Sequence, residues 1–188
     1  AYSFIDLPSE QSGIIDHSLS IGYREMTHSL WMERDLNGNF VSDPNLRFEK
    51  IEREEADNYL SRLKEFMSGS PDEMLEIIFG NLTKLPSQFI DHWFTTEHLY
   101  YVYDKSNLVG ILDLSTQYLN LANIGVSQNH RRKGYGRRIM NFGLKTLKEQ
   151  GKEHSALRVD SVNTAAVQLY ESLGFAKGKE RVALIWRK

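Results

Sequence analysis

The sequence predicts an α/β fold, in which helices cover the faces of a mixed central sheet. Two patterns support this prediction. Apolar residues recur every three or four positions in several segments, and runs rich in β-branched and aromatic residues lie between those segments. From residue 45 onward the expected order is one strand, two helices, three strands, and then helix, strand, helix and strand.

Capping residues and glycines mark the ends of the expected helices. Serine before proline predicts a helix start, and glycine after the last apolar residue predicts an end. These signals place helices at residues 53–67 and 70–79, from the glycine-rich loop to residue 150, and from residue 163 or 164 to 173. The strand candidates are residues 46–52, 99–104, 108–115, 121–127, 155–161 and 181–187.

Composition excludes several classes of protein. The formal net charge is -2, and the chain has no cysteine, which excludes disulfides, cysteine nucleophiles and thiolate metal sites. No apolar run approaches the roughly 20 residues of a membrane span, and the first residues lack a signal-peptide pattern. The histidines show no metal-ligand spacing. We therefore expect a cytoplasmic protein without a metal centre.

The stretch HRRKGYGRRIM, residues 130–140, gathers five Lys and Arg residues around two glycines where a helix begins. A helix N-terminus is already partly positive, so these charges are unfavourable unless an anion binds there. The alternative is a solvated basic turn. The loop is neither a Walker A loop nor a dinucleotide fingerprint, whose third glycine is replaced by Ile139. A nucleic-acid surface is disfavoured because the rest of the chain is not basic.

Two motifs resemble those of the GCN5-related N-acetyltransferases, the GNAT family. In NIGVSQNHRRKGYGRRIM, Arg131, Gly134 and Gly136 fill the family's Arg/Gln-x-x-Gly-x-Gly/Ala pattern after a strand. Downstream, LRVDSVNTAAVQLYESLGF resembles the family's strand, asparagine and Ala-x-x-Leu-Tyr-x-x-x-Gly-Phe helix. The resemblance covers about residues 45–188. It implies a GNAT fold, with a splayed pair of neighbouring parallel strands and helices on both faces.

Residues 1–44 lie outside the resemblance and are expected to form an N-terminal extension before a GNAT domain at 45–188. One observation bears on them. The segment 21–34 resembles 173–188, since both have a glycine followed by an aromatic residue near their start, then a polar stretch, and leucine and a basic residue around a tryptophan. The extension is therefore interpreted as strands from the tail of a degenerate GNAT copy, with two unrelated amphipathic strands as the alternative.

The resemblance implies acetyl-CoA as cosubstrate, bound where the two strands splay, and no metal. The pantetheine arm would pair with the backbone of Ile124 and Val126, and the pyrophosphate would lie on N–H groups of the glycine loop. Asn163 would contact the arm, and Tyr170 would face the sulfur. The implied binding residues are Ile124, Gly125, Val126, Arg131, Arg132, Lys133, Gly134, Tyr135, Gly136, Arg137, Asn163 and Tyr170.

Acyl transfer to an amine needs an oxyanion donor, an acid for the departing thiolate and a base for the amine. The backbone N–H of Val126 is the expected oxyanion donor, and Tyr170 is the expected acid. The base is unassigned, because Arg158 stands where members that acetylate protein amino groups often carry Glu. Asp113 is a candidate base, with His98 or a chain of waters as alternatives.

The expected function is acetyl transfer from acetyl-CoA to a primary amine. The acceptor is expected to be a small molecule rather than a protein, because the Glu typical of protein acetylation is missing. No nucleic-acid or membrane partner is expected, and the protein is expected to be a monomer or homodimer. Two alternatives remain, a non-catalytic acyl-CoA-binding regulatory module on the same fold and a nucleic-acid-binding protein that uses the basic loop.

Overall fold

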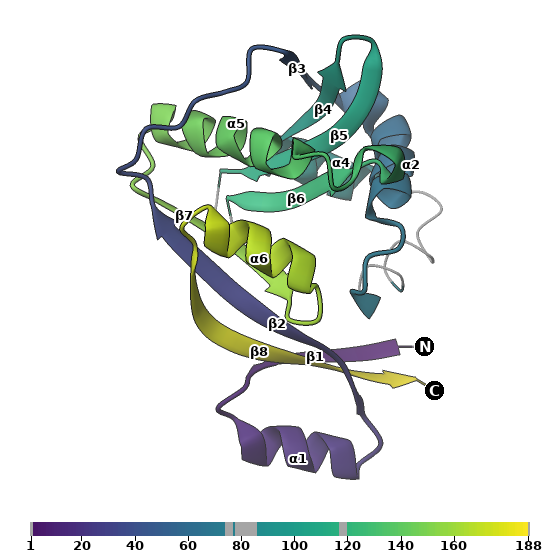
Figure 1. Ribbon diagram of the computed structural model, residues 1–188. Coiled ribbons are helices and arrows are strands. Elements are labelled where there is room, and N and C mark those ends of the chain that lie inside the picture. Colours follow the sequence, from purple (N-terminus) through teal and green to yellow (C-terminus); the bar gives the residue numbers. More distant parts are fainter. Residues whose placement is uncertain (1, 74–76, 78–85, 117–119, 188) are drawn as a thin grey trace.

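The computed structural model describes residues 2–73, 77, 86–116 and 120–187. Within them, eight strands form two four-stranded sheets that lie next to each other (Figure 1). The expected α/β fold is confirmed, with its sheet divided in two. The helix expected at 70–79 lies mostly outside the described residues.

The first sheet has the order β3-β4-β5-β6, and each strand is antiparallel to its neighbours. Leu112 on one face packs against Leu144 of the long helix α5, while Ile111 on the other face packs against the α2 and α4 side. These elements are β3 (Leu46–Lys50), α2 (Ala56–Met67), α4 (Ser87–Thr96), β4 (Glu97–Asp104), β5 (Asn107–Ser115), β6 (Leu121–Val126) and α5 (Tyr135–Glu149). Single 3-10 turns at Arg53–Glu55 (η1) and Gln128–His130 (η2) precede α2 and α5.

The second sheet has the order β1-β8-β2-β7, also antiparallel throughout. Two helices cover one of its faces. Ile15 of α1 packs against Val182 and Leu184, and Val167 of α6 joins the central core beside Leu157. The elements are β1 (Tyr2–Pro8), α1 (Ser12–Ser20), β2 (Arg24–Asp35), β7 (His154–Asp160), α6 (Thr164–Ser172) and β8 (Ala176–Arg187).

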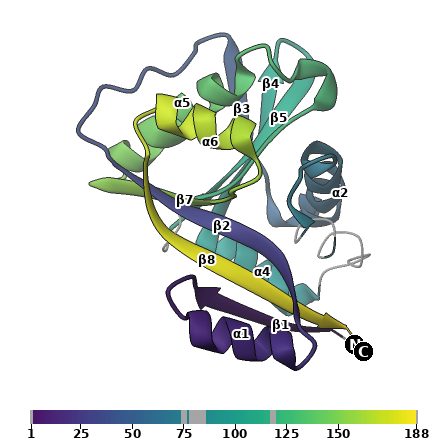
Figure 2. The same cartoon turned by 60° about the horizontal axis from the view of Figure 1, so that its bottom comes forward.

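Two strand-helix-strand units of matching lengths interlock to make this second sheet (Figure 2). β1, α1 and β2 have 7, 9 and 12 residues, as do β7, α6 and β8. A glycine with positive φ follows the helix in each unit, Gly22 at 101° and Gly174 at 84°. β2 and β8, which contain the two similar sequence segments, pair with each other at the centre. The units therefore share one local architecture, although the domain boundary after residue 44 stays a prediction.

β6 and β7 border the two sheets and run in the same direction without a shared ladder in the described residues. Asn120 joins them where they begin. Its side chain accepts hydrogen bonds from Ser155 Oγ (3.1 Å) and from the N–H of Ala156 (2.9 Å), and it donates to the carbonyl of His154 (3.2 Å). Beyond this junction the strands separate.

Some elements were not expected from the sequence. The helices α1 and α4 and the strand β1 lacked clear signals, because α1 and α4 are short and have no side-chain hydrogen bond at their N-caps. β8 begins at Ala176, five residues before the expected strand, since its first half is polar and mostly exposed. The other strands and helices that were expected within the described residues are present, with shifts of a few residues at their ends.

Candidate active site

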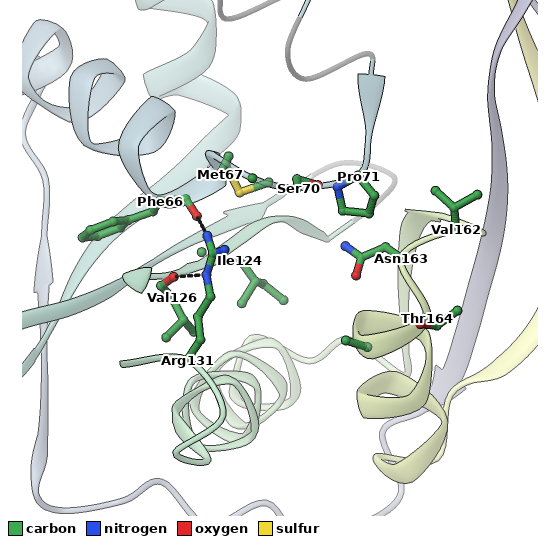
Figure 3. Close-up of a pocket in the computed structure, with 13 residues that line it drawn as sticks. Phe66, Met67, Ser70, Pro71, Ile124, Val126, Arg131, Val162, Asn163 and Thr164 are labelled. Atoms are coloured by element: carbon green, nitrogen blue, oxygen red, sulfur yellow. Dashed lines mark hydrogen bonds between the residues drawn. The ribbon is translucent and has the colours of Figure 1, made fainter. Parts of the chain in front are cut away.

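A cavity of about 410 Å³ opens where β6 separates from the N-terminus of α6 (Figure 3). The C-terminal end of α2 and the residues that follow it form one wall, β6 forms the floor, and the start of α6 forms the opposite wall. The lining residues are Phe66, Met67, Gly69, Ser70, Pro71, Ile124, Gly125, Val126, Arg131, Val162, Asn163, Thr164 and Ala165.

The backbone of β6 turns alternate residues toward this cavity. The N–H of Ser127 donates to the carbonyl of Val109 on β5 at 3.0 Å. In an antiparallel ladder the N–H and C=O of one residue point to the same side, and this side alternates along the strand. The polar backbone groups of Ile124 and Val126 therefore point away from β5, toward the cavity, whereas those of Gly125 point toward β5.

Gly125 supplies space at this position. A Cβ atom there would lie 2.9 Å from Ile111 Cγ1 and 2.9 Å from Phe66 Cβ, closer than real Cβ contacts allow. The missing side chain lets α2 pack directly on β6 beside the cavity. The backbone orientation and the absent Cβ indicate that Gly125 would shape a binding site without bonding to a ligand.

A second cavity, of about 360 Å³, follows the glycine loop and shares Val126, Arg131 and Ala165 with the first. Its other lining residues include Arg132, Gly134, Gly136 and Arg137. Gly134 has φ 83° and Arg132 has φ 61°, so the chain turns through left-handed conformations before α5. Gly136 lies against α6, where an added Cβ would be 3.0 Å from Leu169.

The loop leaves a series of backbone donors unpaired. The first N–H groups of a helix have no partner within the helix. In the described part of the chain, none of the N–H groups of residues 132–137 has a hydrogen bond outside α5. Such donors at a helix N-terminus favour an anion.

Arg131 joins the loop to the far wall of the cleft. Its guanidinium donates to the carbonyl of Val126 on β6 at 3.1 Å, and to the carbonyls of Phe66 (2.8 Å) and Ser68 (2.9 Å) at the end of α2. Figure 3 shows the side chain spanning this gap. Because three carbonyls already accept from its guanidinium, Arg131 holds the walls of the site in place.

Other basic side chains near the loop also have partners within the chain. Arg138 lies 2.6 Å from Asp43 and 3.8 Å from Asp104, and Arg137 donates to Ser172 Oγ at 2.6 Å. The expectation that an anion balances the charge of the first turn therefore needs correction for Arg138, which two carboxylates of the chain already neutralise. Asp43 belongs to the long connection after β2, and no local sequence pattern indicates this pairing.

Three expected binding residues have distinct positions around the loop. Tyr135 lines the second cavity, but its hydroxyl donates to Asp104 at 2.6 Å and so points away from the backbone donors. Lys133 reaches back to the carbonyl of Asn129 at 2.8 Å. Arg132 has an exposed side chain with no partner among the described residues, and it is free to contact a ligand.

Asn163 begins α6 at the edge of the first cavity. Its Oδ1 accepts a hydrogen bond from the N–H of Ala166 at 3.2 Å, which makes it the N-cap of the helix. Of the two helix starts expected from the sequence, residue 163 or 164, the structure shows Asn163 as the cap. Its amide points across the cavity toward Pro71 (Figure 3), and its NH₂ group has no partner in the described structure.

Tyr170 lies two turns further along α6 and is half-buried. Its ring packs edge-on against Phe175, with centroids 6.0 Å apart, and it lines neither cavity. Burial raises the pKa of Tyr170 to about 12. Among the described residues, the hydroxyl of Tyr170 has no hydrogen-bond partner. Every fully buried polar side-chain atom in these residues does have a partner. The hydroxyl is therefore not fully buried, and some of its surface is accessible.

Asp113 lies beneath the cleft. Its side chain has no exposed surface and accepts hydrogen bonds from the Tyr59 hydroxyl on α2 and from Asn123 Nδ2 on β6, the latter at 2.7 Å. Burial raises the pKa of Asp113 to about 8, although the Asn123 hydrogen bond opposes the rise. Sequence patterns gave no indication of the Tyr59 contact, because the two residues are 54 positions apart.

A model of the "Acetyltransferase (GNAT) family" matches residues 63–175, which contain the C-terminal end of α2, the residues that line both cavities and the glycine loop. The chain belongs to the GNAT family. A mycothiol acetyltransferase from Thermobispora bispora is 46% identical over 54 residues, which are 29% of this chain and 18% of that protein. The uncharacterized N-acetyltransferase YobR of Bacillus subtilis is 36% identical over 77 residues, 40% of this chain and 31% of that protein.

A solved GNAT structure from Sphaerobacter thermophilus shares the fold across nearly the whole chain. The TM-score is 0.65 at 15% identity, with 99% of this chain and 60% of that chain covered. The present GNAT chain thus spans less than a third of these two curated relatives and under two thirds of this structure. In its described residues, no helix is long and apolar enough to cross a membrane, and no three His, Cys, Asp or Glu side chains group as metal ligands.

Replacing Arg131 with Gln should destabilise this GNAT chain by about 1–3 kcal/mol, because the hydrogen bonds that join α2 to β6 are lost. Urea denaturation measures the free energy of unfolding. Arg132→Gln is the matched control, since that side chain has no partner in the described structure, and it should change stability by less than about 0.5 kcal/mol. Equal losses in both variants would contradict the bridging role of Arg131.

Stability should fall as pH rises through the range in which Asp113 keeps a proton that the unfolded chain has lost. An Asp in the unfolded chain has a pKa of about 3.9, whereas the folded value is about 8. Between these values the folded state binds more protons, so its stability is greatest at the acidic end of the window. Asp113→Asn should flatten this dependence.

Urea denaturation at pH 5 and pH 8 tests this prediction. The exposed Asp16 provides the control, and Asp16→Asn should keep the wild-type difference between the two pH values. An Asp113→Asn variant with the wild-type pH dependence would show that this carboxyl is ionised throughout.

Proposed function

We propose that this protein transfers an acetyl group from acetyl-CoA to a primary amine. The observation that carries the proposal is the pair of cavities that share Val126, Arg131 and Ala165 in their linings. One contains the backbone groups of Ile124 and Val126 that point away from β5, and the other contains the unpaired N–H groups of residues 132–137. An elongated ligand with a phosphate-rich end suits this combination of an extended backbone edge and a helix N-terminus.

The residues present fit a coenzyme A group. Extended backbone at Ile124 and Val126 can pair with the amides of a pantetheine arm, and the free NH₂ group of Asn163 can donate to the same arm. The loop donors and the unpartnered Arg132 side chain can hold the pyrophosphate. Gly134 and Gly136 keep side chains away from it, and Gly125 would provide space beside the arm.

Two groups of the chain would act on the reacting atoms. The N–H of Val126, which points away from β5, would stabilise negative charge on the carbonyl oxygen as the amine nitrogen attacks the thioester carbon. Tyr170 would hydrogen-bond to the departing sulfur. With a phenol pKa of about 12, full proton transfer to a thiolate of pKa about 8.5 would be uphill by roughly 5 kcal/mol. Tyr170 would therefore act mainly as a neutral hydrogen-bond donor.

The base that removes the amine proton stays unassigned. Asp113 has no exposed surface, so it could take the amine proton only after local opening. This burial favours a second candidate function, a regulatory module that binds acyl-CoA but does not catalyse acyl transfer. The nucleic-acid alternative is weakened, because Arg131, Arg137 and Arg138 already have partners within the chain.

Three further proposals concern the whole protein. GNAT acetyltransferases act on small-molecule or protein amines, and we favour a small molecule here because Arg158 replaces the Glu typical of protein acetylation. The interlocked units of the second sheet support residues 1–44 as the tail of a degenerate GNAT copy. A cytoplasmic monomer or homodimer remains our proposal for its state in the cell.

Acetyl-CoA at 1 mM should raise the melting temperature of the protein, because it binds the folded state alone. A dissociation constant near 10 µM would give about 2.7 kcal/mol of stabilisation, or roughly 5–10 °C. Gly134→Glu should abolish the shift, since it places a carboxylate beside the loop donors. Gly151→Glu is the control, because this glycine also has positive φ and open space around it. A wild-type protein without a shift would exclude both acetyl-CoA functions.

Tyr170→Phe should lower kcat for amine acetylation by about tenfold to a hundredfold, while the melting-temperature shift with acetyl-CoA stays as in wild type. The physical reason is that the hydroxyl would bond to the sulfur mainly as the thiolate departs. Tyr103→Phe, on β4, is the control and should keep the wild-type kcat. Unchanged turnover in Tyr170→Phe would remove this residue from the reaction.

A further inference from the structure

The cleft has two sides with different surroundings. The glycine loop and α5 lie on one side, and α2 lies on the other. In the second sheet, Leu30, Leu157 and Val182 face α6 and α1, on the same side as α5. Alternate residues of a strand point to opposite faces, so their neighbours face the α2 side. This places there a polar cluster of Asp6, Ser29, Arg158 and Arg181.

The polar cluster joins all four strands of the second sheet. Arg158 on β7 donates to both oxygens of Asp6 on β1, at 2.9 Å each, and its Nε donates to Ser29 Oγ on β2 at 2.6 Å. Arg181 on β8 donates to Asp6 Oδ2 and to the Asp6 carbonyl, both at 2.9 Å. The two interlocked units contribute residues from equivalent positions. Asp6 and Arg158 are each the fifth residue of the first strand of their unit, and Ser29 and Arg181 are each the sixth residue of the second strand.

The polar cluster retains positive charge and unused donors. Two guanidinium groups carry ten N–H bonds, of which the hydrogen bonds above use five. Burial alone would raise the pKa of Asp6, but hydrogen bonds from Arg158 and then Arg181 outweigh burial and lower it. Among the four residues of the polar cluster, one carboxylate thus opposes two cations. The exposed fractions, 26% for Arg158 and 30% for Arg181, leave the free donors within reach of a ligand.

Asp160 gives this face a direction. It lies on β7 two residues beyond Arg158, in the direction of Val162, which lines the first cavity. Its side chain is buried, and its oxygens accept hydrogen bonds from the Thr27 hydroxyl and from the N–H of Val162. The α2 side of the second sheet is therefore positive at Arg158 and Arg181 and negative toward the cavity. An acceptor with an anionic end and an amine end would orient its amine toward the cleft.

We propose that the polar cluster binds an anionic group of the acceptor, so that the acceptor is an amine that also carries a carboxylate or a phosphate. The inference rests on the proposed acetyl transfer, because the coenzyme side of the cleft is fixed by the glycine loop and the acceptor must then approach from the α2 side. Guanidinium groups with free N–H bonds are suited to both oxyanions.

Matched pairs of acceptors test the proposal with the full chain and acetyl-CoA. Glycine with glycinamide, β-alanine with β-alaninamide, and lysine with lysinamide vary a carboxylate, while O-phosphoethanolamine with ethanolamine varies a phosphate. The wild type should acetylate at least one acid at least tenfold faster, in kcat/KM, than its neutral partner. The series that shows the preference identifies the oxyanion.

Arg181→Gln should lower kcat/KM for the preferred acid by about tenfold to a hundredfold, mainly through KM, and change the value for its neutral partner by less than about threefold. Arg158→Lys keeps the charge and should retain more of the preference than Arg158→Gln. Arg47→Gln, which breaks an exposed ion pair on β3, is the control and should keep the wild-type preference. A merely structural cluster would lower both members of a pair equally.

The outcomes separate this inference from the proposed function. A wild type that gains stability with acetyl-CoA but acetylates only neutral amines, or acids and neutral partners alike, overturns the anionic acceptor and leaves acetyl transfer standing. Stabilisation by acetyl-CoA without turnover of any acid also overturns it. No stabilisation by acetyl-CoA overturns both. If Arg181→Gln fails to fold, Arg158→Lys and Arg158→Gln provide the same comparison of acid with neutral partner.

Discussion

The separation of β6 from β7 is the constraint on which the rest of this structure depends. Asn120 holds the strands together where they begin, with hydrogen bonds to the first residues of β7. At the other end, Arg131 joins β6 to α2. Between these two points, backbone groups of β6 have no strand to pair with. Unpaired backbone is costly when it is buried, so an opening there is stable only if solvent or a ligand fills it.

Several charged side chains around the cleft have partners within the chain. Arg138 at the start of α5 is neutralised by Asp43 and Asp104, and Asp6 lies between Arg158 and Arg181. Around the cleft, the described residues leave available the loop N–H groups, the Arg132 side chain and the free donors of the polar cluster. They lie on opposite sides of the cleft, which suits a reaction between two separately bound molecules.

Repetition explains how the N-terminal segment fits the sheet. β2 and β8 occupy equivalent positions in two units of matching lengths, and each pairs with the other. Because the strand following each helix is hydrogen-bonded to the other unit, neither unit has a continuous sheet by itself. The polar cluster lies where these units meet, so a stabilising contact between them also supplies the charged surface on the α2 side.

The sequence by itself determined the glycine loop and most of the elements other than α1, α4 and β1, because turn glycines, helix caps and apolar periodicity act over a few residues. Gly134, Gly136 and the Asn163 cap could be recognised in this way. The tertiary structure alone decided where side chains meet across long separations. It buried Asp113 under Tyr59, turned Tyr135 toward Asp104 and placed Arg158 over Asp6, 152 positions away. These outcomes depend on which strands become neighbours, and local sequence patterns do not encode that choice.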